Sequence, residues 1–559
     1  MPALFEKHQH RLEQAIKTCQ NRNYWSPFQE SPARKHHPPD AKQKAFEQFN
    51  SYLNTSFPML LPGTETLCGR EQSPYTTEPL GIKYPHVNIS KLYTSMHRAW
   101  KEWKGESVET RIGACMALLE HWDNNNFLNA FATMHTAGQP FVMSFAGSGA
   151  NALDRGLEAV AHAYLAQNQI PKNADFTRRF GRSEPILIKK QYRLVPRGIA
   201  VVICCGTFPT WNAYPAILAN LATGNPVVVK PHPNGILPMA IAVNTARSLF
   251  FDLGFDPNLI TMVADEPDTP RTLELLQNPD TKIIDFTGSP SFGSWIENNC
   301  RHALVFTETA GCNSVLLEST NDLDGCLNAV AQSLCLFSAQ MCTSAQNIFL
   351  PADGMLVNKT QVSFDDVANM LVEKIDTMTA DPHHAAALCG AVMAKRTLDE
   401  IKNLETNYPD KVLRKSSSYI HPTFPNAQTA TPCVLQLRQS DSDLYHQEHF
   451  GPMSFLIKSP NRAQALKQAT SDAALYGSIS AYAYSTDTEF LEDIQEAYID
   501  AGASVGCNLI KHLPINFSAA YSDYHVSGLN PAGNACLTDM AFVANRFRIV
   551  QSKTELSTP

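Results

Sequence analysis

The stretch that decides the fold begins with Ile199-Ala-Val-Val-Ile-Cys-Cys205 and continues to Val227-Val-Val-Lys230. Both are short β-branched runs, and the residues between them have helical apolar spacing. The alternation continues and predicts three more strands, at 259–263, 282–286 and 304–308. Strand–helix–strand connections of this length are right-handed crossovers, so the pattern predicts a parallel sheet covered on both faces. Ligands of such sheets bind at the carboxyl ends of the strands.

The alternation restarts after Gly311 and predicts a second α/β domain. Its first strands are expected at 313–317 and 346–350, around a helix at 323–337. In the first part of the chain, helices are expected at 3–19 and 40–54. We expect four parts: a helical N-terminal extension (1–90), a first α/β domain (91–307), a second α/β domain (308–517) and a C-terminal return (518–559).

The C-terminal return is expected to be loop-like from about Ser518 and to close with a strand at 541–550. An edge strand at a chain end invites pairing with another subunit. Together with 186–196, which we interpret as part of an oligomerisation hairpin, it predicts a homodimer or homotetramer.

Composition narrows the class of ligand. The 559 residues carry 45 basic and 53 acidic side chains, a formal charge of -8, so a nucleic-acid partner is not expected and the ligands should be small molecules. No apolar run approaches the roughly 20 residues that span a bilayer, so no membrane partner is expected either. The 14 cysteines are scattered without a Cys-x-x-Cys pair, which favours a reducing cytoplasm.

Two patterns resemble known sites, and we interpret both as chance matches. Gly147-Ser-Gly-Ala-Asn-Ala152 fits a dinucleotide fingerprint, but a poor strand precedes it, so we expect an interhelical loop. His446-Gln-Glu-His449 lacks the i, i+4 histidine pair of a zinc-binding helix. No metal site is therefore predicted.

Stronger candidates stand where predicted strands end. At Phe286-Thr-Gly-Ser-Pro-Ser-Phe-Gly293, Ser289 can cap a helix and Pro290 suits its first position, which favours either a structural cap or a phosphate site. Asn212 follows the first strand, before a helix expected to start near Pro215, and is either an amide donor in the crevice or a turn cap. Lys230 ends the second strand and either binds ribose hydroxyls or is solvated.

Two further residues suit covalent catalysis. Glu308 ends the fifth strand, and Cys342 follows the first helix of the second domain, so both can face one interdomain cleft. A buried cysteine is usually only a small apolar side chain, and its position next to a candidate base is what singles out Cys342.

These motifs, in this order, resemble the aldehyde dehydrogenase superfamily: Trp211-Asn212, Lys230-Pro231, Phe286-Thr-Gly-Ser289, Glu308-Thr-Ala-Gly311, Gln340-Met-Cys342 and Glu448-His-Phe-Gly-Pro452. The separation of 34 residues between Glu308 and Cys342 (342 minus 308) is similar to the family spacing of base and nucleophile. Within the superfamily, the N-terminal extension, Met134-His-Thr-Ala-Gly-Gln139 and Asp154-Arg-Gly-Leu-Glu158 resemble the branch that acts in phenylacetate degradation.

The resemblance implies a fold and a set of roles. It implies two parallel-sheet α/β domains, a Rossmann-like dinucleotide-binding domain (91–307) and a catalytic domain (308–517), with a small oligomerisation segment. It also implies Cys342 as nucleophile, Glu308 as general base for water, and the Asn212 amide as an oxyanion donor. The cofactor-binding residues that it implies are Thr210, Trp211, Lys230, His232, Gly288, Ser289, Gly293, Thr309, Glu448 and Phe450.

Three departures from the family pattern bear on the cofactor and its channel. The family's Glu three residues after the lysine is Pro233 here, and because that Glu would repel a 2′-phosphate, NADP is expected in preference to NAD. The family's Glu-Leu-Gly-Gly-Lys reads Glu308-Thr-Ala-Gly-Cys312, and its glycine before Gln-x-Cys is Ala339. Both changes are expected to crowd the cofactor channel.

The expected reaction is NAD(P)-dependent oxidation of an aldehyde to a carboxylic acid through a cysteine thiohemiacetal and thioester. The substrate implied by the resemblance is a semialdehyde from ring cleavage in phenylacetate degradation, with a CoA-linked aldehyde as one form of it. The alternatives are a CoA-acylating dehydrogenase, which would not need Glu308 to activate water, a cysteine-dependent hydrolase and an inactive scaffold.

Overall fold

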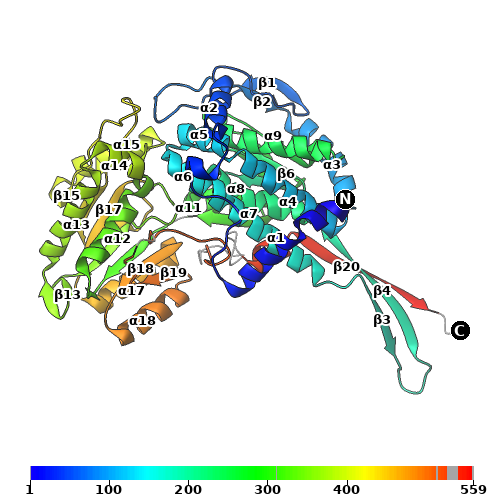
Figure 1. Ribbon diagram of the computed structural model, residues 1–559. Helices are drawn as coiled ribbons and strands as arrows, with labels where there is room; N and C mark the ends of the chain where they lie inside the picture. The colour runs from blue at the N-terminus through cyan, green and yellow to red at the C-terminus, as the bar shows by residue number, and fades with distance from the viewer. Residues whose placement is uncertain (1, 310, 512–513, 526–538, 557–559) are drawn as a thin grey trace.

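The chain folds into two lobes and a projecting arm (Figure 1). The computed structural model describes residues 2–309, 311–511, 514–525 and 539–556. One lobe contains the five-stranded sheet and most of the N-terminal half, and the other contains a seven-stranded sheet. The C-terminal segment leaves the second lobe, returns to the first and ends on the arm.

The first sheet has strand order β7-β6-β5-β8-β9, and every neighbouring pair is parallel. Its strands are β5 (Ile199–Ile203), β6 (Val227–Lys230), β7 (Ile260–Met262), β8 (Thr281–Gly288) and β9 (Leu304–Thr309). All five strands predicted from the sequence are confirmed. The β-branched runs are buried on both faces, as a parallel sheet between helix layers requires.

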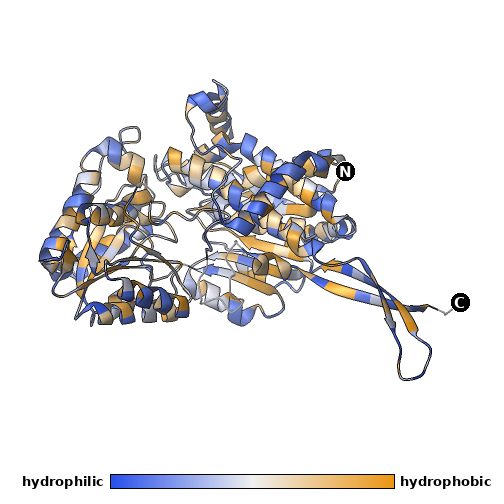
Figure 2. Ribbon diagram, turned by 60° about the horizontal axis from the view of Figure 1, so that its bottom comes forward, coloured by the Kyte–Doolittle hydropathy of each residue, from blue (hydrophilic) through white to orange (hydrophobic). Residues whose placement is uncertain are grey.

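The helices of this lobe connect the strands or pack beside them. They are α3 (Ile89–Trp103), α4 (Val108–Asn124), α5 (Asn126–Ala137), α6 (Phe141–Phe145), α7 (Ala152–Asn168), α8 (Pro209–Ala222), α9 (Ile236–Asp252), α10 (Thr272–Leu276) and α11 (Pro290–Asn299). Figure 2 shows apolar colour in the strands and polar colour on the outer helices, which places the core of each lobe at its sheet.

Helix α8 starts earlier than predicted. We expected it to start near Pro215, but Pro209 occupies the first turn and Pro215 lies inside the helix. Proline is tolerated in a first turn because the N–H that it lacks has no intrahelical partner there. Asn212 therefore lies on a helix and not on a loop, and its side-chain direction is fixed by that helix.

The second sheet has order β15-β16-β17-β12-β10-β18-β19, and its pairs are parallel except for the edge pair β15–β16. Its strands are β10 (Ser314–Leu317), β12 (Asn347–Pro351), β15 (Val412–Arg414), β16 (Cys433–Arg438), β17 (Met453–Ser459), β18 (Ser480–Tyr484) and β19 (Ser504–Cys507). The predicted second α/β unit is confirmed, with its first helix α12 at Leu323–Cys335.

The remaining helices of this lobe are α13 (Phe364–Thr379), α14 (Pro382–Cys389), α15 (Lys395–Asn407), α16 (Ser442–Tyr445), α17 (Arg462–Tyr476) and α18 (Thr488–Asp500). A small three-stranded sheet lies beside it, formed by β11 (Ser319–Thr320), β13 (Met355–Val357) and β14 (Thr360–Val362).

The arm is an antiparallel sheet of three strands in the order β20-β4-β3 (Figure 1). The strands are β3 (Asn173–Arg178), β4 (Ile186–Pro196) and β20 (Phe547–Leu556). The stretch 186–196 is one strand, β4, whose hairpin partner is β3. The strand predicted at 541–550 is wrong in its first half, because Asp539 caps a short helix, α19 (Met540–Ala544), by accepting from the Phe542 N–H.

The N-terminal extension contains α1 (Pro2–Asn21) and α2 (Ala41–Tyr52), close to the predicted helices, and also an unpredicted hairpin of β1 (Thr64–Cys68) and β2 (Tyr84–Val87). Helix α1 packs on α4 and α7. The expected loop at 147–152 is wrong, because residues Ala146–Asn151 form a π-helical turn between α6 and α7. Helix α6, and not a strand, directly precedes that turn, which agrees with our interpretation of the dinucleotide fingerprint at 147–152 as a chance match.

A buried ion pair fastens the C-terminal return to the first sheet. The guanidinium of Arg546 donates to both carboxylate oxygens of Asp285 on β8, at 2.6 and 2.8 Å, and to Asn220 Oδ1 at 2.9 Å. Within the described ranges, no helix is both long enough and apolar enough to span a membrane.

Candidate functional site

A cleft of about 590 Å³ opens where the carboxyl ends of the first sheet face the second lobe. Nine of the thirteen residues singled out in the sequence line it: Asn212, Lys230, His232, Gly288, Ser289, Glu308, Cys342, Glu448 and Phe450. The first six come from one lobe and its strand ends, and the last three come from the other lobe. The cleft thus brings together candidates that are up to 238 residues apart in the chain, as Asn212 and Phe450 are (450 minus 212).

The other four candidates lie beside the cleft and do not line it. The Thr210 hydroxyl donates to the Ser148 carbonyl at 2.6 Å. Gly293 and Thr309 face each other so closely that a Cβ on the glycine would stand 2.6 Å from the threonine methyl. Trp211 stacks edge-on against His525, with 4.8 Å between the ring centroids. Their contacts support the walls of the cleft.

Cys342 follows a short segment with unusual backbone geometry. Phe337, Ser338 and Ala339 have φ values of 50, 48 and 50°, in the left-handed region that is unfavourable for residues other than glycine. Ser338 is held by hydrogen bonds to the carbonyls of Cys389 and Ala430. The chain therefore turns sharply out of α12 and brings the cysteine to the cleft.

Asn313, at the start of β10, anchors the segment after the turn. Its amide nitrogen donates to the carbonyl of Cys342 at 2.6 Å and to that of Ser344 at 3.0 Å. Its amide oxygen accepts from the backbone N–H groups of Ile479 and Ser480 at 3.0 and 3.2 Å. One buried amide thus ties the cysteine loop to the sheet of the second lobe.

Glu308 is the junction of three hydrogen bonds at the end of β9. It is buried, and its Oε2 accepts from the Asn212 amide at 2.6 Å and from the Thr287 hydroxyl at 3.4 Å. Its Oε1 lies 2.7 Å from His525 Nε2. The Asn212 Oδ1 accepts a weak bond from the Cys205 thiol at 3.5 Å, and burial raises the pKa of that thiol to about 12.

His525 is the residue that sequence reasoning missed. Its Nε2 lies 3.6 Å from Cys342 Sγ, and its side chain is only 1% exposed. It belongs to 514–525, which contains no helix or strand, so periodicity offers no signal there. No motif of the sequence includes residue 525, so only the path of the C-terminal return across the cleft reveals this histidine.

The start of α11 forms one wall of the cleft. Ser289 is the N-cap residue of α11 and Pro290 is at its start, as predicted, but the Ser289 side chain makes no capping bond. Instead its hydroxyl lies 3.3 Å from that of Ser291. The Ser289 side chain thus leaves the first N–H groups of the helix without a capping bond from this residue.

Lys230 is buried, contrary to the solvated alternative. Its ammonium donates to Asp265 Oδ1 and to the Pro231 carbonyl, both at 2.8 Å. His232 beside it has a pKa lowered to about 4, chiefly by burial and also by Lys230 and Arg396. Across the cleft, burial and Glu400 raise the pKa of the Glu448 carboxyl to about 7, which Arg396 opposes.

The two departures expected to crowd the cleft do not line it. Cys312 is buried and its thiol donates to the Tyr445 carbonyl at 3.4 Å, with a pKa raised to about 12 by burial. Ala339 is buried within the turn that precedes Cys342. Ala310, which belongs to the motif Glu308-Thr-Ala-Gly-Cys312, lies outside the described residues. The expectation of crowding by these two side chains is therefore wrong.

The pair His446 and His449 does not converge. His446 Nε2 lies 3.0 Å from Asp472, whereas His449 Nδ1 lies 2.7 Å from Glu400 and its Nε2 lies 2.9 Å from the Leu444 carbonyl. These partners account for the positions of both imidazole rings, so a metal ion shared by the two is not needed to explain them.

Comparison with known proteins places the chain among aldehyde dehydrogenases. Residues 83–529 match the pattern that defines the aldehyde dehydrogenase family. The crystal structure of an NAD-dependent aldehyde dehydrogenase from Burkholderia multivorans superposes with a TM-score of 0.96 at 40% identity, over 100% of both chains.

Curated relatives are more distant. An N-succinylglutamate 5-semialdehyde dehydrogenase from Burkholderia cenocepacia is 25% identical over 282 residues, 50% of this chain and 55% of that protein. A 2-aminomuconic 6-semialdehyde dehydrogenase from a Pseudomonas species is 23% identical over 291 residues, 49% of this chain and 55% of that protein. Three further curated relatives are matched over 57% to 65% of their own length.

The left-handed turn before the cysteine generates a stability prediction. We expect Ala339→Gly to raise the free energy of unfolding by about 0.5 to 1 kcal/mol. Glycine relieves the strain of the left-handed backbone, and the greater entropy of the unfolded glycine chain offsets part of this stabilisation. Denaturant unfolding measures it. Ala345→Gly, three residues after the cysteine and outside the left-handed run, is the control and should destabilise. Equal losses in both variants would contradict the strain at Ala339.

Proposed function

We propose, for a chain that belongs to the aldehyde dehydrogenase family, that it oxidises an aldehyde to a carboxylic acid with a nicotinamide cofactor. The observation that carries the proposal is the convergence of Cys342, Glu308 and Asn212 in one cleft between the two lobes. A thiol, a carboxylate and an amide donor in that arrangement are suited to covalent acyl chemistry.

Cys342 supplies the nucleophile. Its thiolate attacks the aldehyde carbonyl and forms a thiohemiacetal, whose oxyanion needs donors that are already in place. The Asn212 amide nitrogen carries two hydrogens, and the Glu308 bond occupies one of them. The second hydrogen and the backbone N–H of Cys342 are the proposed donors to the oxyanion.

Cofactor residues line the other half of the same cleft. NAD(P), when bound, accepts the hydride that leaves the thiohemiacetal carbon. Ser289 and the start of α11 would hold its diphosphate, Lys230 the adenosine ribose, and Glu448, with Phe450 nearby, the ribose on the nicotinamide side. Loss of hydride leaves a thioester on Cys342.

Glu308 completes the turnover by removing a proton from the water that hydrolyses the thioester. Its three hydrogen-bonding partners orient the carboxylate, and its burial keeps bulk water away from it. The thiolate is the leaving group and returns to its starting state.

The roles of Cys342 and Glu308 separate in a burst experiment. We expect Cys342→Ser to abolish cofactor reduction, and Glu308→Gln to retain a single-turnover burst while its steady-state rate falls about a hundredfold or more, because acylation needs no water. Stopped-flow absorbance of the reduced nicotinamide measures both. Cys507→Ser, at a half-buried cysteine on β19, is the matched control. An unchanged steady-state rate in Glu308→Gln would contradict the assigned base.

Product analysis in the same experiment separates the alternatives. A free carboxylic acid supports hydrolysis by water, whereas acyl-CoA as the main product would show a CoA-acylating enzyme. Hydrolysis of esters or thioesters without any cofactor reduction would favour the hydrolase, and failure to bind a dinucleotide would favour the scaffold.

For the substrate we propose a semialdehyde, free or CoA-linked, from ring cleavage in phenylacetate degradation. Two curated relatives act on semialdehydes by name. The motifs that resemble the phenylacetic acid degradation protein PaaN lie next to the site: Gln139 donates to the Thr207 carbonyl at 2.6 Å, and Arg155 donates to the Asp523 carbonyl at 3.2 Å. A panel of aromatic, aliphatic and CoA-linked aldehydes ranked by kcat/KM decides among them.

For the cofactor we propose that NADP is used, in preference to NAD. Pro233 lies in the cleft where the family pattern has a glutamate, so no carboxylate at that position repels a 2′-phosphate. The similar Burkholderia multivorans enzyme is described as NAD-dependent, which makes NAD the competing outcome.

A carboxylate at position 233 should reverse the preference. We expect Pro233→Glu to lower kcat/KM for NADP at least tenfold relative to NAD, because it places a negative charge beside the 2′-phosphate. Initial rates with both cofactors measure the ratio, and Pro233→Gln, which is neutral and of similar size, is the control. A wild-type enzyme that strongly favours NAD would overturn the proposal.

We infer that the chain forms a homodimer or homotetramer through its arm. The strands β20 and β3 are both edges of the arm sheet, and Ile549 and Val550 are about half exposed there. Unpaired strand edges with apolar side chains favour pairing with another subunit. We expect sedimentation equilibrium to give a multiple of the monomer mass, and Ile549→Lys to shift it toward monomer more than Gln551→Lys does. A monomeric wild type would contradict this assembly.

We place the enzyme in a reducing compartment such as the cytoplasm. The thirteen cysteines in the described part of the chain form no disulfide with one another. A catalytic thiol requires such an environment to stay reduced.

A further inference from the structure

We propose that His525 takes the thiol proton of Cys342 and so generates the nucleophile, and that Arg22 and Arg155 hold the segment carrying His525 in place. The proposal rests on the proposed function, because it assigns the group that activates the same cysteine. It also gives the N-terminal helix α1 a role in the active site. His525 is a catalytic residue in this scheme, and the two arginines are positioning residues.

The geometry around His525 places its Nε2 between two reacting groups. It lies 3.6 Å from Cys342 Sγ and 2.7 Å from Glu308 Oε1. The three ligand atoms of this trio lie within 4.8 Å of one another, and the histidine and glutamate are buried. The contact between histidine nitrogen and sulfur is within the range of a hydrogen bond to sulfur, so a proton can pass directly.

Electrostatics makes a cation necessary at this position. A buried carboxylate a few ångströms from a thiol disfavours the thiolate, because like charges repel strongly where water is excluded. Glu308 must keep its negative charge to act as the base in the later step. Its repulsion of the thiolate therefore has to be offset by another group. An imidazolium between the two groups interacts favourably with both negative charges.

The proton step balances without an external acid or base. The S–H bond of Cys342 breaks and an N–H bond forms at Nε2, while the other ring nitrogen keeps its own proton. The thiol becomes a thiolate and the neutral imidazole becomes an imidazolium. The new N–H donates to Glu308 Oε1, a bond that the neutral ring with an unprotonated Nε2 cannot make, so the 2.7 Å contact corresponds to the imidazolium–thiolate pair that the step produces. After thioester hydrolysis the released thiolate meets the imidazolium again, so the pair is restored at each turnover.

The groups that surround His525 come from four parts of the fold. Glu308 faces it from β9, Cys342 from the turn after α12, and Trp211 from α8. The guanidinium of Arg155 on α7 lies on the Trp211 ring at 5.2 Å from its centroid. Among the residues that the structure describes, the titratable groups in these contacts are Glu308 and Cys342, with the permanent cation of Arg155 behind the indole.

Helix α7 fixes the backbone just before His525. Arg155 is fully buried and donates to the Asp523 carbonyl at 3.2 Å and to the Ser518 hydroxyl at 2.7 Å. Its charge is balanced by Glu158 at 2.9 Å. The motif Asp154-Arg-Gly-Leu-Glu158, which the proposed reaction leaves unexplained, thus holds 518–523.

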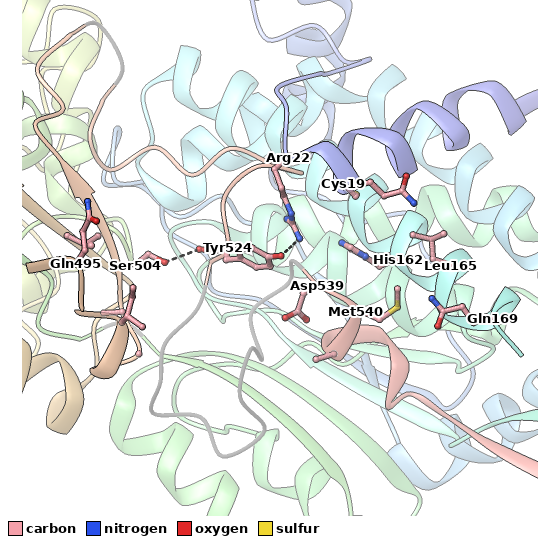
Figure 3. A pocket seen from close by; sticks show the side chains of 16 residues that line it. Cys19, Arg22, His162, Leu165, Gln169, Gln495, Ser504, Tyr524, Asp539 and Met540 are labelled. Atoms are coloured by element: carbon pink, nitrogen blue, oxygen red, sulfur yellow. Dashed lines mark hydrogen bonds between the residues drawn. The ribbon is translucent and has the colours of Figure 1, made fainter. Parts of the chain in front are cut away.

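Helix α1 holds the same segment from the other side (Figure 3). Arg22 follows its last residue and donates to the Tyr521 carbonyl at 3.2 Å and to the Tyr524 hydroxyl at 2.5 Å. Its guanidinium also lies 4.0 Å from the centroid of the Tyr524 ring. Figure 3 shows Tyr524 between Arg22 and Ser504, whose hydroxyl donates to the Tyr524 carbonyl at 3.4 Å. His525 is the next residue.

The test is the pH dependence of Cys342 alkylation by iodoacetamide, a neutral reagent that attacks only the thiolate. The full-length protein is used with EDTA and without aldehyde or cofactor, and peptide mass spectrometry quantifies each cysteine. Because no turnover is needed, the result is independent of whether the proposed oxidation is correct. Cys507 is the internal reference thiol.

We expect His525→Gln to lower the alkylation rate of Cys342 at pH 7 at least tenfold and to raise its pH midpoint by at least one unit, while Cys507 is unchanged. Glutamine can still donate to Glu308 but cannot bind the thiol proton, so loss of the hydrogen bond is not the cause. Both proteins should reach the same rate at high pH. An unchanged midpoint would overturn the proposal, as would wild-type alkylation that occurs only when EDTA has removed a bound metal ion.

Arg22→Met tests the positioning role. It also keeps the proposal testable if His525→Gln does not fold. We expect the Cys342 alkylation rate at pH 7 to fall at least about threefold, because the variant loses the hydrogen bonds to the Tyr521 carbonyl and the Tyr524 hydroxyl, with an unaltered rate at Cys507. Arg11→Met, the same change on the same helix but away from 514–525, is the control. Equal effects of Arg22→Met and Arg11→Met on Cys342 would overturn the role of α1.

Discussion

The buried ion pair between Arg546 and Asp285 determines where the chain returns from the second lobe to the first. Both side chains are almost fully buried, and the guanidinium engages both carboxylate oxygens. Leaving either charge unpaired in that position costs several kcal/mol, so the C-terminal segment has one place to dock on β8. The described segment 514–525 lies between the second lobe and that point in the chain, and it places His525 against Cys342.

The fold could be predicted because its signals are local. Short β-branched runs such as 227–230 that alternate with helical spacing specify a parallel sheet, and the strand ends then specify the crevice. The errors also have local causes. Pro209 and Pro215 both suit a helix start, and only the packing of the first turn shows that the earlier one starts α8. At 541–550, the cap at Asp539 starts a helical turn before the strand, which the apolar pattern alone does not show.

The site was predictable where one side chain stands at the end of a regular element. Glu308, Lys230 and Ser289 are of this kind, and each lies in the cleft. The geometry of Cys342 was not, because it depends on three consecutive left-handed residues held by distant carbonyls. His525 was not either, because an irregular segment reaches its place through arginines on two helices. Such contacts have large sequence separations, 502 residues for Arg22 and Tyr524, and leave no periodic trace.

The same contacts explain how the N-terminal extension and the C-terminal return meet beside the cleft. An irregular segment loses conformational entropy when it is fixed, and 514–525 has no strand partner to compensate for that loss. Arg22 and Arg155 supply the missing interactions, the first just after the end of α1 and the second in the first turn of α7. Since Glu308 is held from the sheet side by Asn212 and Thr287, the reacting carboxylate and the imidazole are fixed by independent parts of the fold. The distance between them is thus set by how α1, α7 and β9 pack, so a change in the extension would reach the proposed nucleophile, Cys342, without a contact to substrate or cofactor.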